Sequence, residues 1–229
     1  MKPFKVEFDF AAPVCRESEY PMHLDALIAF ALMKEHEDMG EANPWEAASD
    51  LSGYLDKTEG PDWCWKASWV KLEALDNVQF INTIRKCEPD RIYNGLNEGL
   101  WQPKGGTLSE SRQKTFSVNT RSGQLRGYQW LLPIQWVRGV AWGIGSIEDV
   151  EYLLQSRIRY MGKQTRNGYG RIKAITVTEA PAAEANHWMY RCMPVMPEKS
   201  PWQYAQVMGT VRPPYWRKTE RVPAFEPVE

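Results

Sequence analysis

The chain has 229 residues and a formal net charge of −1. Its size suits one domain with insertions, and its overall charge does not by itself predict a nucleic-acid partner. No apolar run is long enough to cross a membrane, and the four cysteines and three histidines lie apart, without the spacing of zinc ligands. We therefore expect a cytoplasmic protein with reduced thiols and without a metal, a cofactor or a membrane segment.

Acidic and basic residues are nonetheless separated along the chain. Residues 35–62 contain nine Asp or Glu and one Lys, whereas residues 103–173 contain twelve Lys or Arg and four Asp or Glu. This asymmetry predicts one face that binds a polyanion and a separate acidic face, the alternative being two solvated surfaces of different charge. Eleven tryptophans are a high number, and any that are exposed would indicate a binding surface.

The first half of the chain alternates strand and helix patterns. Residues 4–10 alternate apolar and polar side chains, which predicts a strand, and residues 23–36 carry an apolar stripe at helical spacing. The acidic segment 38–62 is punctuated by Gly and Pro, and we expect a loop or a short helix there. Residues 65–75 and 78–86 are predicted to be strands.

In the second half, residues 88–106 are broken by Pro and Gly and are expected to be irregular. Two alternating runs in residues 112–136 surround Arg-Ser-Gly, which indicates a hairpin. Residues 137–145 are predicted to be a strand with closely packed glycines, residues 147–160 an amphipathic helix and residues 171–178 a strand.

The order strand, helix, strand, strand, helix, strand predicts an α+β, ferredoxin-like fold, the split βαβ pattern of RRM-like domains. Helices on one sheet face would leave the other face free for a ligand. Residues 1–229 would then form a single domain with three additions: the acidic segment 38–62, a basic β-hairpin at about 107–130 and an extended tail at 181–229.

The segment RYMGKQTRNGYGRIKAITV, residues 159–177, joins the last predicted helix to the last predicted strand. Nucleotide-binding glycine loops run from a strand to a helix N-terminus, so the reversed order here argues against a nucleotide pocket. Exposed amides at its glycines, neighbouring cations and a tyrosine ring would suit a single-stranded phosphodiester backbone. The alternative is a helix-capping glycine followed by a β-bulge with surface lysines.

The segment GKQTRNGYGRIKAITV resembles the C-terminal glycine-rich loop of the RAMP superfamily, the RNA-binding ferredoxin-like proteins of CRISPR systems. PMHLDALIAFAL, residues 21–32, is similar to the first-helix motif of the subunits that cap the 5′ end of the guide RNA. The closest resemblance is to the type IV subunit that binds the 5′ handle. It covers about residues 3–36 and 128–180, and not the middle insertion or the tail.

The resemblance implies a non-catalytic subunit that binds guide RNA (crRNA). Its expected partners are the crRNA and the neighbouring CRISPR backbone and large subunits, and target DNA near the guide 5′ end is a further candidate. The basic hairpin resembles the thumb with which such subunits wedge between nucleotides of the handle. The implied RNA-binding residues are His23, Arg112, Lys114, Phe116, Arg121, Arg126, Lys163, Gln164, Thr165, Arg166, Asn167, Gly168, Tyr169, Gly170 and Arg171.

Two other functions stay open from the sequence. Some RAMP proteins cleave precursor crRNA with a histidine as general base, and His23, at the start of the first helix, would be the candidate in a metal-independent endoribonuclease. A general RNA-recognition module is the third possibility, although the strands lack its aromatic signature. We expect Asp25 to cap the first helix turn.

The tail combines cations with aromatic residues. Arg212, Tyr215, Trp216 and Arg217 are candidates for contact with nucleic acid or a neighbouring subunit, and Pro213 and Pro214 would hold this segment extended.

Overall fold

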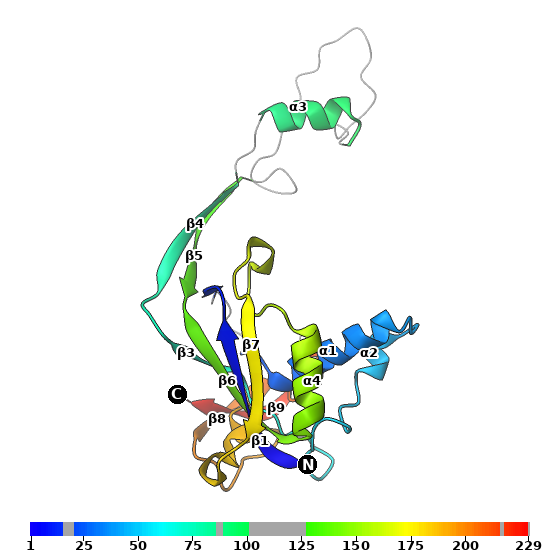
Figure 1. Ribbon diagram of the computed structural model, residues 1–229, viewed down its shortest axis with the longest axis vertical. Helices are drawn as coiled ribbons and strands as arrows, with labels where there is room; N and C mark the ends of the chain where they lie inside the picture. The colour runs from blue at the N-terminus through cyan, green and yellow to red at the C-terminus, as the bar shows by residue number, and fades with distance from the viewer. Residues whose placement is uncertain (16–20, 86–88, 101–126, 216–217, 229) are drawn as a thin grey trace. The chain divides into compact units, whose positions relative to one another are not determined.

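The structure is a computed structural model of residues 1–229, and it describes all of them except 16–20, 86–88, 101–126, 216–217 and 229. The chain forms two compact units, which we call the main unit (Met1–Gln79 with Ile134–Glu229) and the insert unit (Phe80–Pro133). Figure 1 shows the elements of both. The strands are β1 (Lys2–Phe10), β2 (Val14–Cys15), β3 (Lys71–Ala74), β4 (Gln79–Arg85), β5 (Tyr128–Gln135), β6 (Val137–Gly145), β7 (Ile172–Glu179), β8 (Gln203–Gly209) and β9 (Val222–Val228). The helices are α1 (Leu24–Asp38), α2 (Pro44–Ala47), α3 (Pro89–Asn97) and α4 (Ile147–Arg157), with 3-10 turns at Thr165–Asn167, Ala182–Glu184, His187–Met189 and Lys218–Glu220.

An antiparallel sheet in the order β3-β6-β1-β7 forms the centre of the main unit. The predicted strands at 4–10, 137–145 and 171–178 are confirmed, and the α+β class with them. Alternation along β1 buries Phe4, Val6, Phe8 and Phe10 on one face. A Cβ at Gly143 would lie 2.5 Å from the Phe4 ring, so this glycine allows close packing between β6 and β1.

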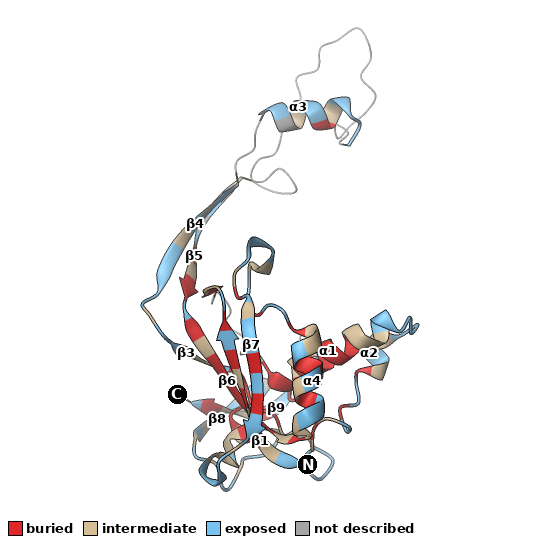
Figure 2. Cartoon of the chain, viewed as in Figure 1, coloured by how far each residue is buried: buried red, intermediate tan, exposed pale blue. Residues whose placement is uncertain are grey.

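Helices α1 and α4 contact each other and cover that apolar face (Figure 1). The predicted stripe on α1 is confirmed, because Leu24, Ile28, Ala31 and Leu32 are buried. Figure 2 shows the buried residues of both helices and of the sheet. α4 contributes Val150, Leu153 and Leu154, together with Ile158 just beyond its end.

Side chains of α4 also cover the main-chain edge of β7. The Gln155 amide donates to the Ile175 carbonyl at 2.8 Å, and the Glu151 carboxylate accepts from the Val177 N–H at 3.3 Å. These bonds satisfy edge groups that another strand would otherwise pair with.

Two predictions for the middle of the chain are corrected. Only 71–74 of the predicted strand 65–75 is a regular strand, and the residues before it pair singly, as Ala67 does with Gly143. Residues 89–97, expected to be irregular, form α3 in the insert unit, because Pro89 lies at the first helical position, where its missing N–H costs nothing. The predicted strand 78–86 is confirmed as β4, which pairs with β5.

We predicted an extended C-terminal tail, but part of the tail folds back on itself. β8 and β9 form a hairpin, and the main chain of Met193 pairs with Phe225 through two 2.8 Å hydrogen bonds. Neighbouring rings then connect the tail to the sheet, with centroids 5.0–5.6 Å apart, in the order Trp142, His187, Trp202, Tyr190, Trp69. Several of the tryptophans therefore hold the tail in place.

This docking covers part of the sheet face that we expected to be free. Trp142 lies opposite Lys5 in the register and so faces away from α1 and α4, yet it is buried, and its indole donates to Glu184 of the tail at 2.6 Å. The expectation of an open face is therefore wrong for β6.

Candidate nucleic-acid interface

The loop between α4 and β7, residues 159–171, is a hydrogen-bonded hairpin. Its two arms pair through Met161 N–H to the Gly170 carbonyl and Ile172 N–H to the Arg159 carbonyl, both at 2.9 Å. The Gly170 N–H donates to the Pro13 carbonyl at 2.8 Å, so the loop is also fastened to the segment after β1. The loop is consequently held in place from two sides.

The glycines of this loop serve different purposes. Gly170 has φ +64°, and a Cβ there would lie 1.8 Å from the Met161 carbonyl oxygen. Gly162 has φ +93°, and a Cβ there would lie 3.0 Å from a Val14 methyl group. Gly168 has φ +88° but open space around it. Gly162 and Gly170 thus allow the loop to pack tightly.

The expectation that all three glycines offer free amides is wrong. The amide of Gly170 is bonded to Pro13, and that of Gly168 donates to the Thr165 carbonyl at 3.0 Å. Contacts to a phosphodiester backbone would therefore come chiefly from side chains of the loop.

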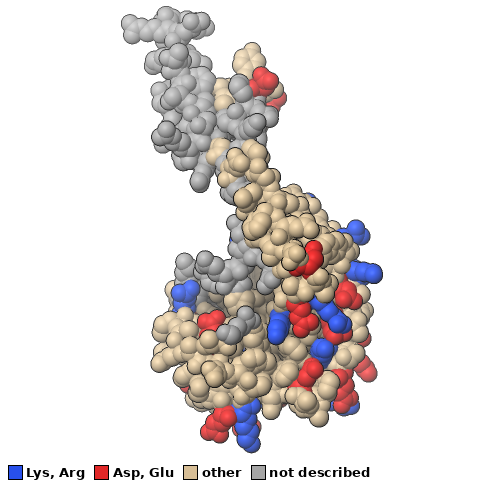
Figure 3. Space-filling model, turned by 90° about the vertical axis from the view of Figure 1, so that its left-hand side faces the viewer, with Lys and Arg blue, Asp and Glu red and all other residues tan. Residues whose placement is uncertain are grey.

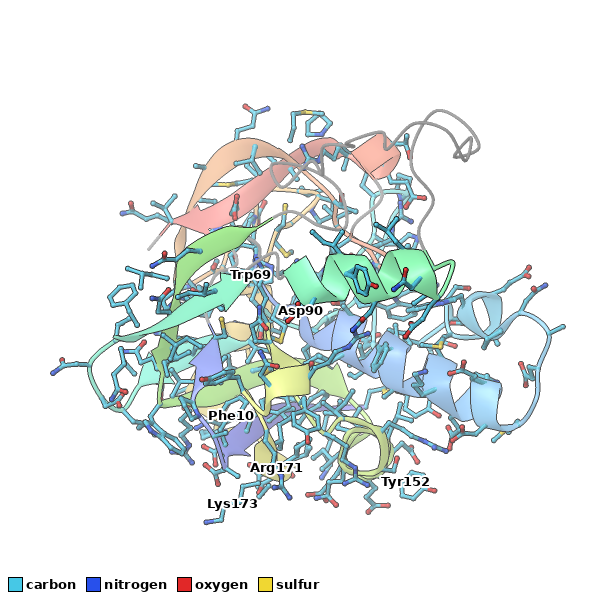
Figure 4. All side chains as sticks on the ribbon, turned by 90° about the horizontal axis from the view of Figure 1, so that it is seen from above. Phe10, Trp69, Asp90, Tyr152, Arg171 and Lys173 are labelled. Carbon is cyan, nitrogen blue, oxygen red and sulfur yellow. The ribbon has the colours of Figure 1, made fainter. Side chains whose placement is uncertain are left out.

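The loop presents its cations to solvent. Lys163, Arg166 and Arg171 are all exposed, and Figure 4 shows Arg171 close to a fourth cation, Lys173, which the sequence analysis did not single out. Within the part of the chain that the structure describes, neither Arg166 nor Arg171 forms an ion pair with the protein. Their charge is available to a phosphate.

The remaining candidate residues of the loop surround these cations. Thr165, Arg166 and Asn167 form a 3-10 turn, and the Asn167 amide donates to the Gln164 side-chain oxygen at 2.9 Å. Gln164 itself has φ +57°, in the left-handed region. Tyr169 is half-buried. The structure thus brings all nine predicted residues of the loop into one hydrogen-bonded element.

Acidic and basic side chains are interspersed over the main unit on the face that Figure 3 shows. On the sheet, Arg138 pairs with Glu7 at 2.8 Å, and Lys5 pairs with the same carboxylate at 3.1 Å. Asp9, 4.0 Å from the Arg138 guanidinium, balances the second cation. Within the described part of the chain, Arg166 and Arg171 of the loop differ from these cations in having no ion-pair partner.

The five predicted RNA-binding residues of the thumb lie outside the described residues. Arg112, Lys114, Phe116, Arg121 and Arg126 all fall within 101–126. Their assignment to RNA stays a prediction.

His23 lies in the interior and not on the loop 159–171. It is 8% exposed, its ring stacks on Tyr215 with centroids 3.5 Å apart, and it meets the Trp69 ring edge-on at 5.8 Å. Burial, followed by the charge of Arg191, lowers the pKa of His23 well below its usual value, so the imidazole is neutral near pH 7.

Beside His23 lies an ion pair that the sequence did not indicate. The Arg191 guanidinium, fully buried, donates to Asp25 at 3.1 Å, to the Trp65 carbonyl at 2.6 Å and to the Ala67 carbonyl at 2.9 Å. It also donates to the Tyr215 hydroxyl, which in turn donates to Asp25 at 2.6 Å.

We expected Asp25 to cap the first helix turn, but capping is only part of its role. Its carboxylate binds the tail, although one oxygen also accepts from the Ala26 N–H at 3.0 Å. Burial raises the pKa of Asp25, against the opposing effect of Arg191. Burial also raises the pKa of Tyr215, so its hydroxyl keeps the proton that it donates to Asp25.

The tail residues proposed to contact a partner are separated by the fold. Tyr215 belongs to the buried cluster, and the Arg212 guanidinium lies 4.7 Å from the centre of the Trp63 ring. Lys57 lies over the same ring at 5.2 Å. Trp216 and Arg217 are outside the described residues.

Among the described residues, no three His, Cys, Asp or Glu side chains gather where they could hold a metal ion. Cys15, Cys64 and Cys192 are buried. None of the described helices has the length and apolar composition needed to span a bilayer.

These features define an α+β protein with a rigid cationic loop at one end of its sheet. A family model described as CRISPR type IV associated protein Csf3 matches residues 2–227. Because the match covers nearly the whole chain, the protein belongs to this family, and the resemblance inferred from the loop and the first helix is confirmed. Comparison with curated proteins gave no match.

Proposed function

We propose that this chain is a non-catalytic guide-RNA-binding subunit of a type IV CRISPR ribonucleoprotein, and that it caps the 5′ handle of the guide. Membership in a type IV CRISPR family implies partners in a complex. The observation that carries the RNA assignment is the loop 159–171, where exposed Lys163, Arg166 and Arg171 project from a backbone fixed by Gly170. Because the loop backbone is already held by hydrogen bonds, binding a phosphate would cost little backbone entropy.

The arrangement of the sheet supports a ferredoxin-like domain of the RAMP type. The order β3-β6-β1-β7, with α1 after β1 and α4 after β6, is that of a split βαβ unit. In this arrangement the loop follows the second helix and leads into the last strand. That is the position of the glycine-rich loop in the superfamily that the sequence resembles.

The burial of His23 favours binding over cleavage. A general base must reach the 2′-hydroxyl of the substrate, either directly or through one water. His23 is covered by Tyr215 and Trp69, and its low pKa reflects that covering. We therefore leave His23 out of the RNA site and assign it to the attachment of the tail.

The basic hairpin at about 107–130 would act as the thumb at the handle and would supply phosphate contacts and the Phe116 wedge. The crRNA, the backbone subunit and the large subunit are the proposed partners. Target DNA near the 5′ end of the guide is a further one.

The test is a titration of single-stranded repeat RNA, followed by fluorescence anisotropy at several salt concentrations. If the loop contacts phosphates, Lys163→Ala, Arg166→Ala and Arg171→Ala should each reduce the slope of log affinity against log salt by about 0.7. Lys2→Ala is the matched control, because Lys2 is exposed at the opposite end of β1. Wild-type slopes in all three loop variants would remove the loop from the RNA site.

The same RNA incubated with the protein should stay intact. Specific cleavage that is lost in His23→Ala, with folding unchanged, would support the endoribonuclease instead.

A further inference from the structure

The turn between α1 and α2, which we call the α1–α2 corner (residues 37–46), is an ordered projection of the main unit. Main-chain hydrogen bonds hold its two ends: Gly40 N–H donates to the Glu37 carbonyl at 3.0 Å, Glu41 N–H to the His36 carbonyl at 3.1 Å and Glu46 N–H to the Asn43 carbonyl at 3.1 Å. Just beyond it, Ala48 and Leu51 are buried in the core. The corner is therefore fixed at both ends.

The α1–α2 corner nevertheless contributes nothing to the core. α2 has no buried residue, Trp45 is 55% exposed and Met39 is 67% exposed. Exposing so much of a tryptophan on a rigid projection forgoes the burial that its ring would gain in the core. Tryptophans in such positions are the typical anchors of protein interfaces.

The charge of the corner indicates what would cover it. Residues 37–46 contain four acids and no Lys or Arg. Lys34 pairs with Glu37, and Arg157 pairs with Asp38. Within the described part of the chain, Glu41 has only the His36 ring as an ionic partner, and Glu46 accepts only from the Asn43 amide.

Two carboxylates beside an exposed tryptophan repel phosphate and attract Lys or Arg. The matching surface is an apolar pocket bordered by basic side chains. Backbone phosphates of RNA do not fit that description.

We propose that the α1–α2 corner docks onto a basic protein subunit of the same CRISPR complex. Trp45 enters an apolar pocket of that subunit, and Glu41 and Glu46 face its Lys or Arg side chains. The main chain is already ordered, so docking costs little conformational entropy. This interface is separate from RNA binding by the loop 159–171 and does not depend on it.

The first experiment places p-benzoylphenylalanine at position 45 and irradiates the complex reconstituted from its purified subunits and guide RNA. The expected product is a covalent adduct with another protein subunit, with the attachment site in a basic segment of that subunit. The matched control is position 208 on β8, because Met208 is exposed to a similar degree, 61%. An adduct with guide RNA, an adduct with a second copy of this chain, or no adduct in an assembled complex would each overturn the proposal.

The second experiment measures the affinity of labelled protein for the remaining assembled subunits. Trp45→Ala should weaken this binding at least about tenfold, as expected for an interface anchor, and Met208→Ala should leave it unchanged. Glu41→Lys combined with Glu46→Lys should weaken it as well. Unchanged binding in the Trp45→Ala and double-lysine variants would contradict the interface.

Two measurements separate this interface from other effects. Thermal unfolding of Trp45→Ala should match the wild type, because Trp45 is mostly exposed. The affinity of isolated Trp45→Ala for repeat RNA should also match, whereas Arg166→Ala should lose RNA affinity and keep the protein interface. If Trp45→Ala lost both protein binding and RNA binding, the two sites would not be separate.

Discussion

Arg191 and Asp25 form a fully buried ion pair, with 3.1 Å between nitrogen and oxygen, although 166 positions separate them in the sequence. The pair connects the C-terminal tail to the first turn of α1. The hydroxyl of Tyr215 bridges the same two groups. The residues that attach the tail therefore belong to the buried interior of the main unit.

Replacing Arg191 by Met should strongly destabilise the protein. The change removes the guanidinium from the buried Asp25 carboxylate and from the carbonyl groups of Trp65, Ala67, Val211 and Cys192. The expected loss is about 3–5 kcal/mol for a broken buried pair. Urea denaturation followed by tryptophan fluorescence would measure it. Arg166→Met, on the exposed loop, is the control and should change the unfolding free energy by less than about 0.5 kcal/mol. Equal effects of the two substitutions would contradict a structural role for the ion pair.

Stability should fall as the pH drops below neutrality. Because burial and then the charge of Arg191 lower the pKa of His23, the unfolded chain binds a proton that the folded chain excludes. This contribution to stability is complete above the unfolded pKa of about 6.5 and is lost at up to about 1.4 kcal/mol per pH unit as the pH falls below it.

His23→Phe keeps the ring in place and removes the titrating group. Urea unfolding at pH 7 and pH 5.5 should therefore show a smaller difference in the variant than in the wild type. His187, whose pKa burial also lowers, would account for part of the remainder. An unchanged pH dependence in His23→Phe would show that this imidazole is not excluded from protonation.

Alanine at two glycines of the loop should have unequal effects. Gly170→Ala places a Cβ 1.8 Å from a carbonyl oxygen at positive φ and should cost at least about 2 kcal/mol. Gly168→Ala meets only the unfavourable φ, a cost of about 1 kcal/mol, and should keep its RNA affinity. Thermal unfolding and anisotropy titration would check both, and equal destabilisation would disprove the distinction.

Deleting residues 112–126, with a short Gly linker in their place, should leave the main unit folded. Rejoining the flanking segments changes the loop-closure entropy by about 1 kcal/mol or less. The deletion removes four cations and Phe116, so capping of the 5′ handle should be lost in a band-shift assay. A shortened protein that still assembles on guide RNA like the wild type would show that this segment is not the thumb.

The sequence predicted the elements whose own residue pattern reflects burial on one side. Alternation in 4–10 and the apolar stripe of 23–36 gave β1 and α1 within two residues of their ends, because each pattern reflects burial on one side. The strand 65–75 was predicted too long because its alternation comes partly from side chains that meet the tail, such as Trp69 with Tyr190.

The tail itself could not be predicted in this way. Arg191 looks like any surface cation in the sequence, and only the fold brings Asp25, Tyr215 and the carbonyl of Val211 around it. The loop residues were found because glycines and cations occur together there. For the α1–α2 corner, the only sequence signal of a binding surface was a tryptophan among acidic residues.

The ion pair also sets an order of events during synthesis. Asp25 leaves the ribosome early, and its partner follows only after 166 more positions of the chain have been made. Until then the carboxylate has no guanidinium, and the nascent protein lacks a part of its interior. Chains that terminate before Arg191 are therefore incompletely packed and open to proteases. Quality control in the cell would remove them before they compete with complete chains for a place in a complex.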